Sequence, residues 1–329
     1  MNFKIYSLTF MALINFTVAL AQAPNNTGTY YKDADGKTGR TLKTALCNII
    51  SKGYNQQTYS AIWTAYKTTD TKPGTNKIYD IYSNTSDYTY GVDQAGNYKE
   101  EGDVYNREHT FPKSWFGGKK YPMYTDLFHV MPSDGYVNNK RDNYPFGTNN
   151  GEKYSSNNNY SKLGRSTTEG YSGIVFEPND EYKGDMARNY FYMATRYENV
   201  IEKWNGDEGA ILAQDSYKPY KDWQMNMLMQ WSKDDPVSPK ETARNDAVYA
   251  IQKNRNPFID YPGLEEYIWG SKVGSPFSYD KYDFSSGIVQ IENEERRQNS
   301  VIFDLQGRRV EKTTRGIYIM NGKKYLLNK

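Results

Sequence analysis

Cysteine and histidine are scarce in this chain, whose 329 residues include one cysteine and two histidines. The lone Cys47 cannot form a disulfide within the chain, so stability has to come from packing. Its neighbours follow an apolar pattern at helical spacing, which favours a buried thiol over a nucleophile. Most zinc sites need three or four Cys and His ligands, and this composition cannot fill them.

An excess of charge of one sign is also missing. The chain has 41 Lys and Arg residues against 39 Asp and Glu residues, a formal net charge of +2. Such a balance creates no global basic field that would attract a polyanion. Any affinity for nucleic acid must therefore come from a local cluster of Lys and Arg side chains.

A long apolar run occurs at the N-terminus, where Lys4 precedes a run from Ile5 to Leu20 and small residues end at Ala21. This order predicts a secretory signal peptide over residues 1–21. An uncleaved anchor helix is the alternative, and the run is short for a bilayer. We therefore expect a mature chain without a transmembrane span, secreted or held at the outer cell surface, with the periplasm as the alternative.

Hydrophobic periodicity predicts several helices. Residues 41–66 alternate apolar and polar side chains at helical spacing, and Gly53 is a plausible break between two helices. Further helices are predicted over residues 185–197 and 239–255. Residues 77–82 are β-prone and predict a strand.

The chain length allows one large domain with appendages. We assign this domain to residues 22–270 and expect it to be a monomer. Residues 271–299 are polar without periodicity, which is typical of a linker. Residues 300–329 alternate like strands around an Asn321-Gly322 hairpin turn and predict a small β-rich tail.

Both histidines fall in one polar stretch, residues 105–143, which is the first candidate for an active site because histidine moves protons near neutral pH. Mg²⁺ keeps several waters and often takes one or two protein oxygens, and Glu108 and Asn138 could supply that pair. His109 could then activate the attacking water. Lys140 and Arg141 lie close enough to Asn138 in sequence to contact phosphate.

Other interpretations of these residues stay open at this point. A Glu-His pair followed by Asn is a weak motif by itself and also occurs on ordinary polar surfaces. His129 is either a packed core histidine or a group that orients the active site from behind. Asp126 could orient a histidine or cap a turn.

Several separate segments resemble the bacterial endonuclease I family of secreted or periplasmic nucleases. The matching segments are residues 107–114, 126–127, 132–147, 177–178, 183–188, 235–238 and 254–260. The resemblance covers residues 30–269. It implies an α+β fold with a mixed α/β nuclease domain and a ββα-metal active-site motif. It also implies cleavage of DNA, and often RNA, with little sequence preference and with 5′-phosphate products.

By this resemblance His109 matches the general base, and Glu108 and Asn138 match the ligands of a divalent metal, Mg²⁺ with Ca²⁺ or Mn²⁺ as alternatives. Arg141 and Asn143 match family positions with catalytic, phosphate-binding or structural roles. The chain has one cysteine where the periplasmic members have several. We therefore expect no dependence on oxidising conditions.

The C-terminal tail resembles the sorting domains of the type IX secretion system of Bacteroidetes, through residues 304–310, 316–319 and 322–324. That likeness implies the secretion machinery as a partner and export to, or attachment at, the cell surface. A small accessory β-hairpin is the alternative. For the whole chain, a metal-dependent nuclease is the leading hypothesis, against a surface module that binds nucleic acid or glycan without cutting it.

Overall fold

The computed structural model describes residues 23–94 and 97–284, together with residues 289–290, 302–303, 310, 316–320 and 323–327 of the C-terminal part. The predicted signal peptide, residues 285–288 and 291–299 of the predicted linker, and the Asn321-Gly322 turn lie outside the described residues. Among the helices described, none is both long and apolar enough to cross a membrane.

The described chain is a mixture of helices and short, mostly antiparallel strands, as the α+β prediction requires. The helices are α1 Gly39–Ser51, α2 Ala61–Thr69, α3 Gly135–Arg141, α4 Asp180–Arg196, α5 Glu198–Ile201, α6 Asp222–Asp234, α7 Pro239–Gln252, α8 Pro257–Asp260 and α9 Leu264–Ile268. The strands are β1 Tyr105–His109, β2 Val130–Asp134, β3 Tyr154–Ser155, β4 Lys162–Arg165, β5 Ile174–Glu177, β6 Val289–Gln290, β7 Ile302–Phe303, β8 Gly316–Met320 and β9 Lys323–Leu327.

The predicted helices are confirmed, including the break after the first of them, because α1 ends before Gly53 and α2 starts after it. Helix α7 begins as its sequence predicts, with Pro239 in its first turn. The Ser238 hydroxyl accepts a hydrogen bond from the Glu241 amide, and the Glu241 carboxylate accepts one from the Ser238 amide. This capping box satisfies two amide groups that the helix itself leaves unpaired.

The strand predicted over residues 77–82 is wrong. Only isolated bridges form there, at Lys77 and Ile78. The physical reason is Asp80, whose Oδ1 accepts hydrogen bonds from the backbone N–H groups of Tyr82 and Ser83. An aspartate that bonds the backbone two residues on stabilises a turn and competes with strand pairing.

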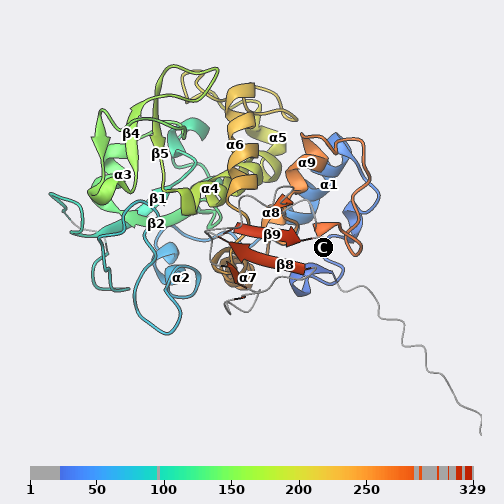
Figure 1. The fold of residues 1–329 in the computed structure, drawn as a ribbon, viewed down its shortest axis with the longest axis horizontal. Helices are drawn as coiled ribbons and strands as arrows, with labels where there is room; N and C mark the ends of the chain where they lie inside the picture. The colour runs from blue at the N-terminus through green and yellow to red at the C-terminus, as the bar shows by residue number, and fades with distance from the viewer. Residues whose placement is uncertain are drawn as a thin grey trace, which may run out of the picture.

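Helix α4 lies between two groups of elements (Figure 1). The sheets β1–β2 and β3–β4–β5 and helix α3 lie on one side of it, and α1, α6, α8 and α9 gather on the other. Its side chains from Gly184 to Thr195 are buried. Two tyrosines of this core have partners for their hydroxyl groups: Tyr192 donates to Asp126, and Tyr220 donates to the carbonyl oxygen of Tyr190.

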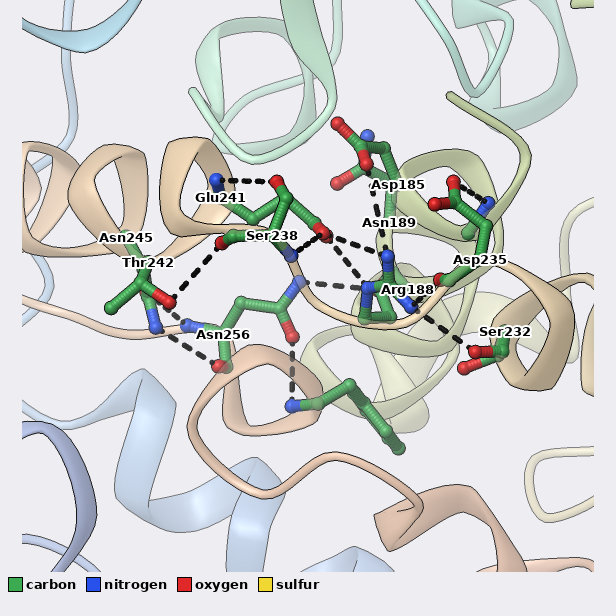
Figure 2. A network of polar contacts seen from close by, with 12 residues as sticks. Asp185, Arg188, Asn189, Ser232, Asp235, Ser238, Glu241, Thr242, Asn245 and Asn256 are labelled. Atoms are coloured by element: carbon green, nitrogen blue, oxygen red, sulfur yellow. Dashed lines mark hydrogen bonds and ion pairs between the residues drawn. The ribbon is translucent and has the colours of Figure 1, made fainter. Parts of the chain in front are cut away.

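A buried network of ion pairs and hydrogen bonds connects α4 to α7 (Figure 2). Arg188 of α4 donates through Nε and Nη2 to the two carboxylate oxygens of Glu241, at 2.6 and 2.7 Å. Its Nη1 donates to the carbonyl oxygen of Asp235 at 2.8 Å. A bidentate pair of this kind fixes the relative position of the two elements that carry it.

The packed part of the chain continues past Gly270, where the sequence predicted a linker. Phe277 and Tyr282 are buried, and both rings contact the ring of Tyr261. The segment is mostly polar and its two buried aromatic residues are not regularly spaced, so the sequence pattern did not indicate that it packs against the domain. Farther on, β8 and β9 pair as the antiparallel strands of the predicted hairpin, with Met320 opposite Lys323.

Candidate active site

Most of the predicted site residues lie on strand β1, which carries Glu108 and His109, and on helix α3, which carries Asn138, Lys140 and Arg141. Strands β1 and β2 are antiparallel, with His109 opposite Val130 and Tyr105 opposite Asp134. Helix α3 starts immediately after β2, and the Asp134 carboxylate accepts a hydrogen bond from the Val137 amide at 2.9 Å. This N-cap turns the chain so that α3 packs beside β1. The expected ββα arrangement is present.

A polar cavity of about 450 Å³ opens beside β1 and α3. Its lining includes five of the predicted residues: Glu108, His109, Asn138, Arg141 and Asn143. The other lining residues are Tyr59, Trp63, Tyr98, Asn106, Arg107, Pro112, Lys113, Asn139 and Asp142. The lining thus brings together the proposed base, the proposed metal ligands and several cationic groups.

Glu108 has 3% of its surface exposed. Its Oε1 accepts hydrogen bonds from the Tyr82 hydroxyl at 2.8 Å and from Nη1 of Arg141 at 2.9 Å. Burial raises the pKa of Glu108, and the positive charge of Arg141 opposes that rise. Because both hydrogen bonds end on Oε1, lone pairs of Oε2 remain for a ligand in the cavity.

Arg141 is 1% exposed and faces the protein interior. Besides its bond to Glu108, it donates to the carbonyl oxygens of His109 at 3.0 Å and Thr110 at 2.7 Å. The guanidinium therefore ties α3 to the end of β1. This geometry suits a positioning residue that holds Glu108, and it differs from the catalytic phosphate contact that the sequence suggested.

His109 is 5% exposed, and its Nε2 lies 3.0 Å from the carbonyl oxygen of Tyr124. A carbonyl only accepts, so Nε2 carries the proton and Nδ1 has the free lone pair. Burial is the main cause that lowers the pKa of His109 well below its ordinary value. The imidazole is thus neutral near pH 7, as a proton acceptor must be.

Asn138 is oriented by a neighbour that the sequence analysis missed. Its Nδ2 donates to Oδ1 of Asn106 at 2.6 Å. With the amide nitrogen engaged, the carbonyl oxygen of Asn138 is the atom that can meet a cation in the cavity. Asn106 lies on β1 two residues before Glu108, and this closeness to a predicted metal ligand is the feature of the sequence that could have identified it.

His129 and Asp126 lie outside the cavity lining. His129 is fully buried, its Nε2 donates to the carbonyl oxygen of Met123 at 2.6 Å, and its ring lies 5.5 Å from that of His109. It therefore packs behind His109. Asp126 caps a turn through the Phe128 amide and accepts hydrogen bonds from two tyrosine hydroxyls.

The two remaining predicted residues, Asn143 and Lys140, differ in their placement. Asn143 is exposed in the cavity lining, where its Nδ2 donates to Asp142. Lys140 is absent from the lining, and its Nζ lies 4.8 Å from the ring centroid of Tyr136 and 5.8 Å from that of Tyr154. Lys140 thus covers tyrosine rings on the flank of α3.

The oxygen atoms in this cavity fit a hard divalent cation. A carboxylate oxygen of Glu108 and the amide oxygen of Asn138 are ligands that Mg²⁺ accepts together with water and substrate oxygens. Within residues 23–94 and 97–284 and the described tail segments, no group of three or more His, Cys, Asp or Glu residues is placed to hold a metal. A cation here would therefore rest on few protein ligands.

Comparisons with known proteins agree with this geometry. Residues 38–263 match the family model of endonuclease I. The chain is 39% identical over 254 residues to an extracellular ribonuclease of Bacillus subtilis (strain 168), an alignment that covers 74% of this chain and 79% of that relative. It is 28% identical over 138 residues to an extracellular deoxyribonuclease of Aeromonas hydrophila, covering 42% of this chain and 50% of that relative. The match to the family model spans more than half of the chain, and the protein therefore belongs to the endonuclease I family of nucleases.

Proposed function

We propose that this protein is a secreted, Mg²⁺-dependent endonuclease that hydrolyses the phosphodiester bonds of DNA and RNA with little sequence preference. One observation carries the proposal. A buried imidazole with a fixed tautomer, His109, lies in one cavity with the oxygen ligands Glu108 and Asn138. That combination supplies a proton acceptor and a cation site within the same small volume.

In the proposed reaction, Nδ1 of His109 removes a proton from a water molecule that attacks the phosphorus atom. The P–O3′ bond breaks, the phosphate stays on the 5′-oxygen of the nucleotide downstream of the cut, and the 3′-oxygen takes a proton from solvent. The Tyr124 carbonyl accepts the Nε2 proton throughout, so it stabilises the imidazolium that forms. Glu108 and Asn138 would hold the Mg²⁺, which neutralises charge on the phosphate when it is bound.

Cleavage of both DNA and RNA needs a site that acts on the phosphate and ignores the sugar. In the proposed reaction the nucleophile is water, and no step uses the 2′-hydroxyl of RNA. Relatives named as an extracellular ribonuclease and as an extracellular deoxyribonuclease support this breadth. Their names also support secretion, which the predicted signal peptide would direct.

We also propose that the β-rich tail presents the nuclease to a type IX secretion machinery, with the mature enzyme acting as a monomer at or beyond the outer cell surface. The support is the resemblance of the tail sequence to sorting domains. A chain truncated after residue 299 should then keep its nuclease activity and lose its export. If the truncated chain were exported normally, the tail would have no such role.

The test of the proposed function is digestion of plasmid DNA and of RNA in three parallel reactions: with Mg²⁺, with EDTA, and with EDTA followed by excess Mg²⁺. We expect cleavage, loss of cleavage and recovery. Glu108→Gln should cleave poorly even in excess Mg²⁺, whereas the control Glu202→Gln, at an exposed position, should match wild type. Binding without cleavage in Mg²⁺ would instead favour a non-catalytic nucleic-acid module.

A further inference from the structure

Arg107 is held between two aromatic rings at the edge of the cavity. Its guanidinium carbon lies 3.5 Å from the ring centroid of Tyr59 and 4.3 Å from that of Trp63. Its Nη1 donates to the carbonyl oxygen of Tyr59 at 2.6 Å. A guanidinium stacked in this way keeps its charge and its donors in one plane, and little conformational entropy remains to be lost when it binds a ligand.

The same stack reaches the proposed base. The ring of Tyr59 is stacked on that of Tyr124 at 4.5 Å, and the carbonyl oxygen of Tyr124 accepts the proton of His109 Nε2. The ring of Tyr59 also lies nearly parallel to that of His109, 6.1 Å away. One aromatic side chain thus contacts both Arg107 and the group that orients His109, so the two are fixed relative to each other.

Most of the hydrogen-bonding capacity of Arg107 is unused. A guanidinium has five N–H donors, and within the described residues the one hydrogen bond found for Arg107 is that to Tyr59. Its Nε is buried without a partner. No carboxylate of the described residues forms an ion pair with it, in contrast to Arg141, which is paired with Glu108. Arg107 is therefore a fixed, uncompensated cation in the cavity lining.

The position of Arg107 on β1 indicates which anion it would meet. Arg107 and His109 are alternate residues of the strand, so their side chains leave it on the same side. Two residues of a strand span about 7 Å, which is comparable to the spacing of successive phosphates along a nucleic acid strand. A chain whose scissile phosphate faces His109 would therefore bring a neighbouring phosphate to Arg107.

We propose that Arg107 forms a second phosphate-binding position, which takes a phosphate next to the one that is cut. This inference rests on the proposed nuclease function and adds a substrate requirement to it. The enzyme should cleave polymers and oligonucleotides far better than a diester that carries a single phosphate. Arg107 would bind charge away from the reacting atoms, so its loss should raise KM and leave kcat nearly unchanged.

The test is a set of short oligothymidylates with one cleavable linkage, in which each flanking phosphate in turn is replaced by an uncharged methylphosphonate. For the wild-type enzyme we expect one flanking position at which this replacement lowers kcat/KM by about 10-fold or more, the size of one charged hydrogen-bonded contact. With Arg107→Gln, which keeps a planar side chain without the charge, replacement at that position should have almost no further effect.

Thymidine 5′-(p-nitrophenyl phosphate), which has no flanking phosphate, supplies the second measurement. Its cleavage should be slow and equal in wild type and Arg107→Gln. The control is Arg165→Gln, at an exposed arginine outside the cavity lining, and it should behave as wild type on every substrate. His109→Ala should be inactive on all of them, so activity in that variant would contradict the proposed function and not the role of Arg107.

Two results would overturn the second phosphate position. One is a wild-type enzyme that tolerates a methylphosphonate at every flanking position, which needs no variant and so does not depend on how well Arg107→Gln folds. The other is an Arg107→Gln variant that loses the same factor on the single-phosphate ester as on the oligonucleotides. That pattern would place Arg107 at the scissile phosphate or in a purely structural role.

Discussion

Replacing Arg141 by methionine should strongly destabilise the fold, because it leaves the Glu108 carboxylate buried without its cationic partner. The two residues, Arg141 and Glu108, are 1% and 3% exposed, and the N–O distance between their side chains is 2.9 Å. Removal of one partner from a buried pair typically lowers the free energy of unfolding by about 3–5 kcal/mol. The carbonyl oxygens of His109 and Thr110 lose a donor in the same substitution, so we expect the upper part of that range.

The effect should depend on pH with a defined sign. Burial already raises the pKa of Glu108, and Arg141 holds it down, so the pKa rises further in the variant. A carboxyl group with a raised folded-state pKa favours the folded state below its unfolded pKa and loses that contribution as pH rises through the folded pKa. Arg141→Met should therefore be less destabilising near pH 5 than near pH 8.

The assay is urea unfolding of the wild-type protein and of Arg141→Met, in EDTA, near pH 5 and near pH 8. Lys77→Met is the matched control, because it breaks an ion pair with Asp87 at the protein surface and should lower the free energy of unfolding far less than Arg141→Met does. The double variant Glu108→Gln/Arg141→Met should recover part of the lost stability, since no charge is then left buried. A loss for Arg141→Met as small as that of the control, or one that is equal at both pH values, would refute the reasoning.

Three further predictions concern metal use, redox state and substrate reading. Asn106→Ala should raise the Mg²⁺ concentration for half-maximal cleavage several-fold, because the Asn138 amide loses its anchor at 2.6 Å; an unchanged Mg²⁺ titration would contradict this. Reducing agents should leave activity unchanged, because the lone cysteine, Cys47, is buried and forms no disulfide; inactivation by dithiothreitol would show otherwise. Cleavage should weaken steeply with added salt and should show little sequence preference, because contacts to phosphates release counterions and carry no sequence information. Mapping the cut sites on a random duplex at low and high salt checks both expectations, and a strong consensus sequence around the cuts would contradict the second.

The sequence was informative for the candidate site, because one short stretch of the chain contains the predicted base and the predicted metal ligands. Residues 105–143 contain β1, β2 and α3 with no other strand or α-helix between them, so neighbours in the motif remain neighbours in space. Glu108, His109 and Asn138 could therefore be brought together without knowledge of the rest of the fold. The helices followed in the same way from local periodicity and capping residues, as in α7.

The parts that the sequence could not predict depend on contacts between distant segments. Tyr59 lies just before α2 and Trp63 lies within it, and no spacing rule connects them to Arg107. Tyr82, which donates to Glu108, lies 26 residues before it in a region without a motif. The burial of Arg141 is likewise a tertiary property, because an arginine at the end of a short polar helix is ordinarily exposed.

The central claim is that His109 is the general base, and the rate of DNA cleavage by His109→Ala at saturating Mg²⁺ tests it most directly. Loss of a general base typically slows turnover about 100- to 10,000-fold. We expect a loss of that size with unchanged folding and unchanged DNA binding, because the proposed role of His109 is to accept a proton through Nδ1 and not to hold metal or substrate. Added imidazole should restore part of the rate. Cleavage by His109→Ala at the wild-type rate would contradict the account.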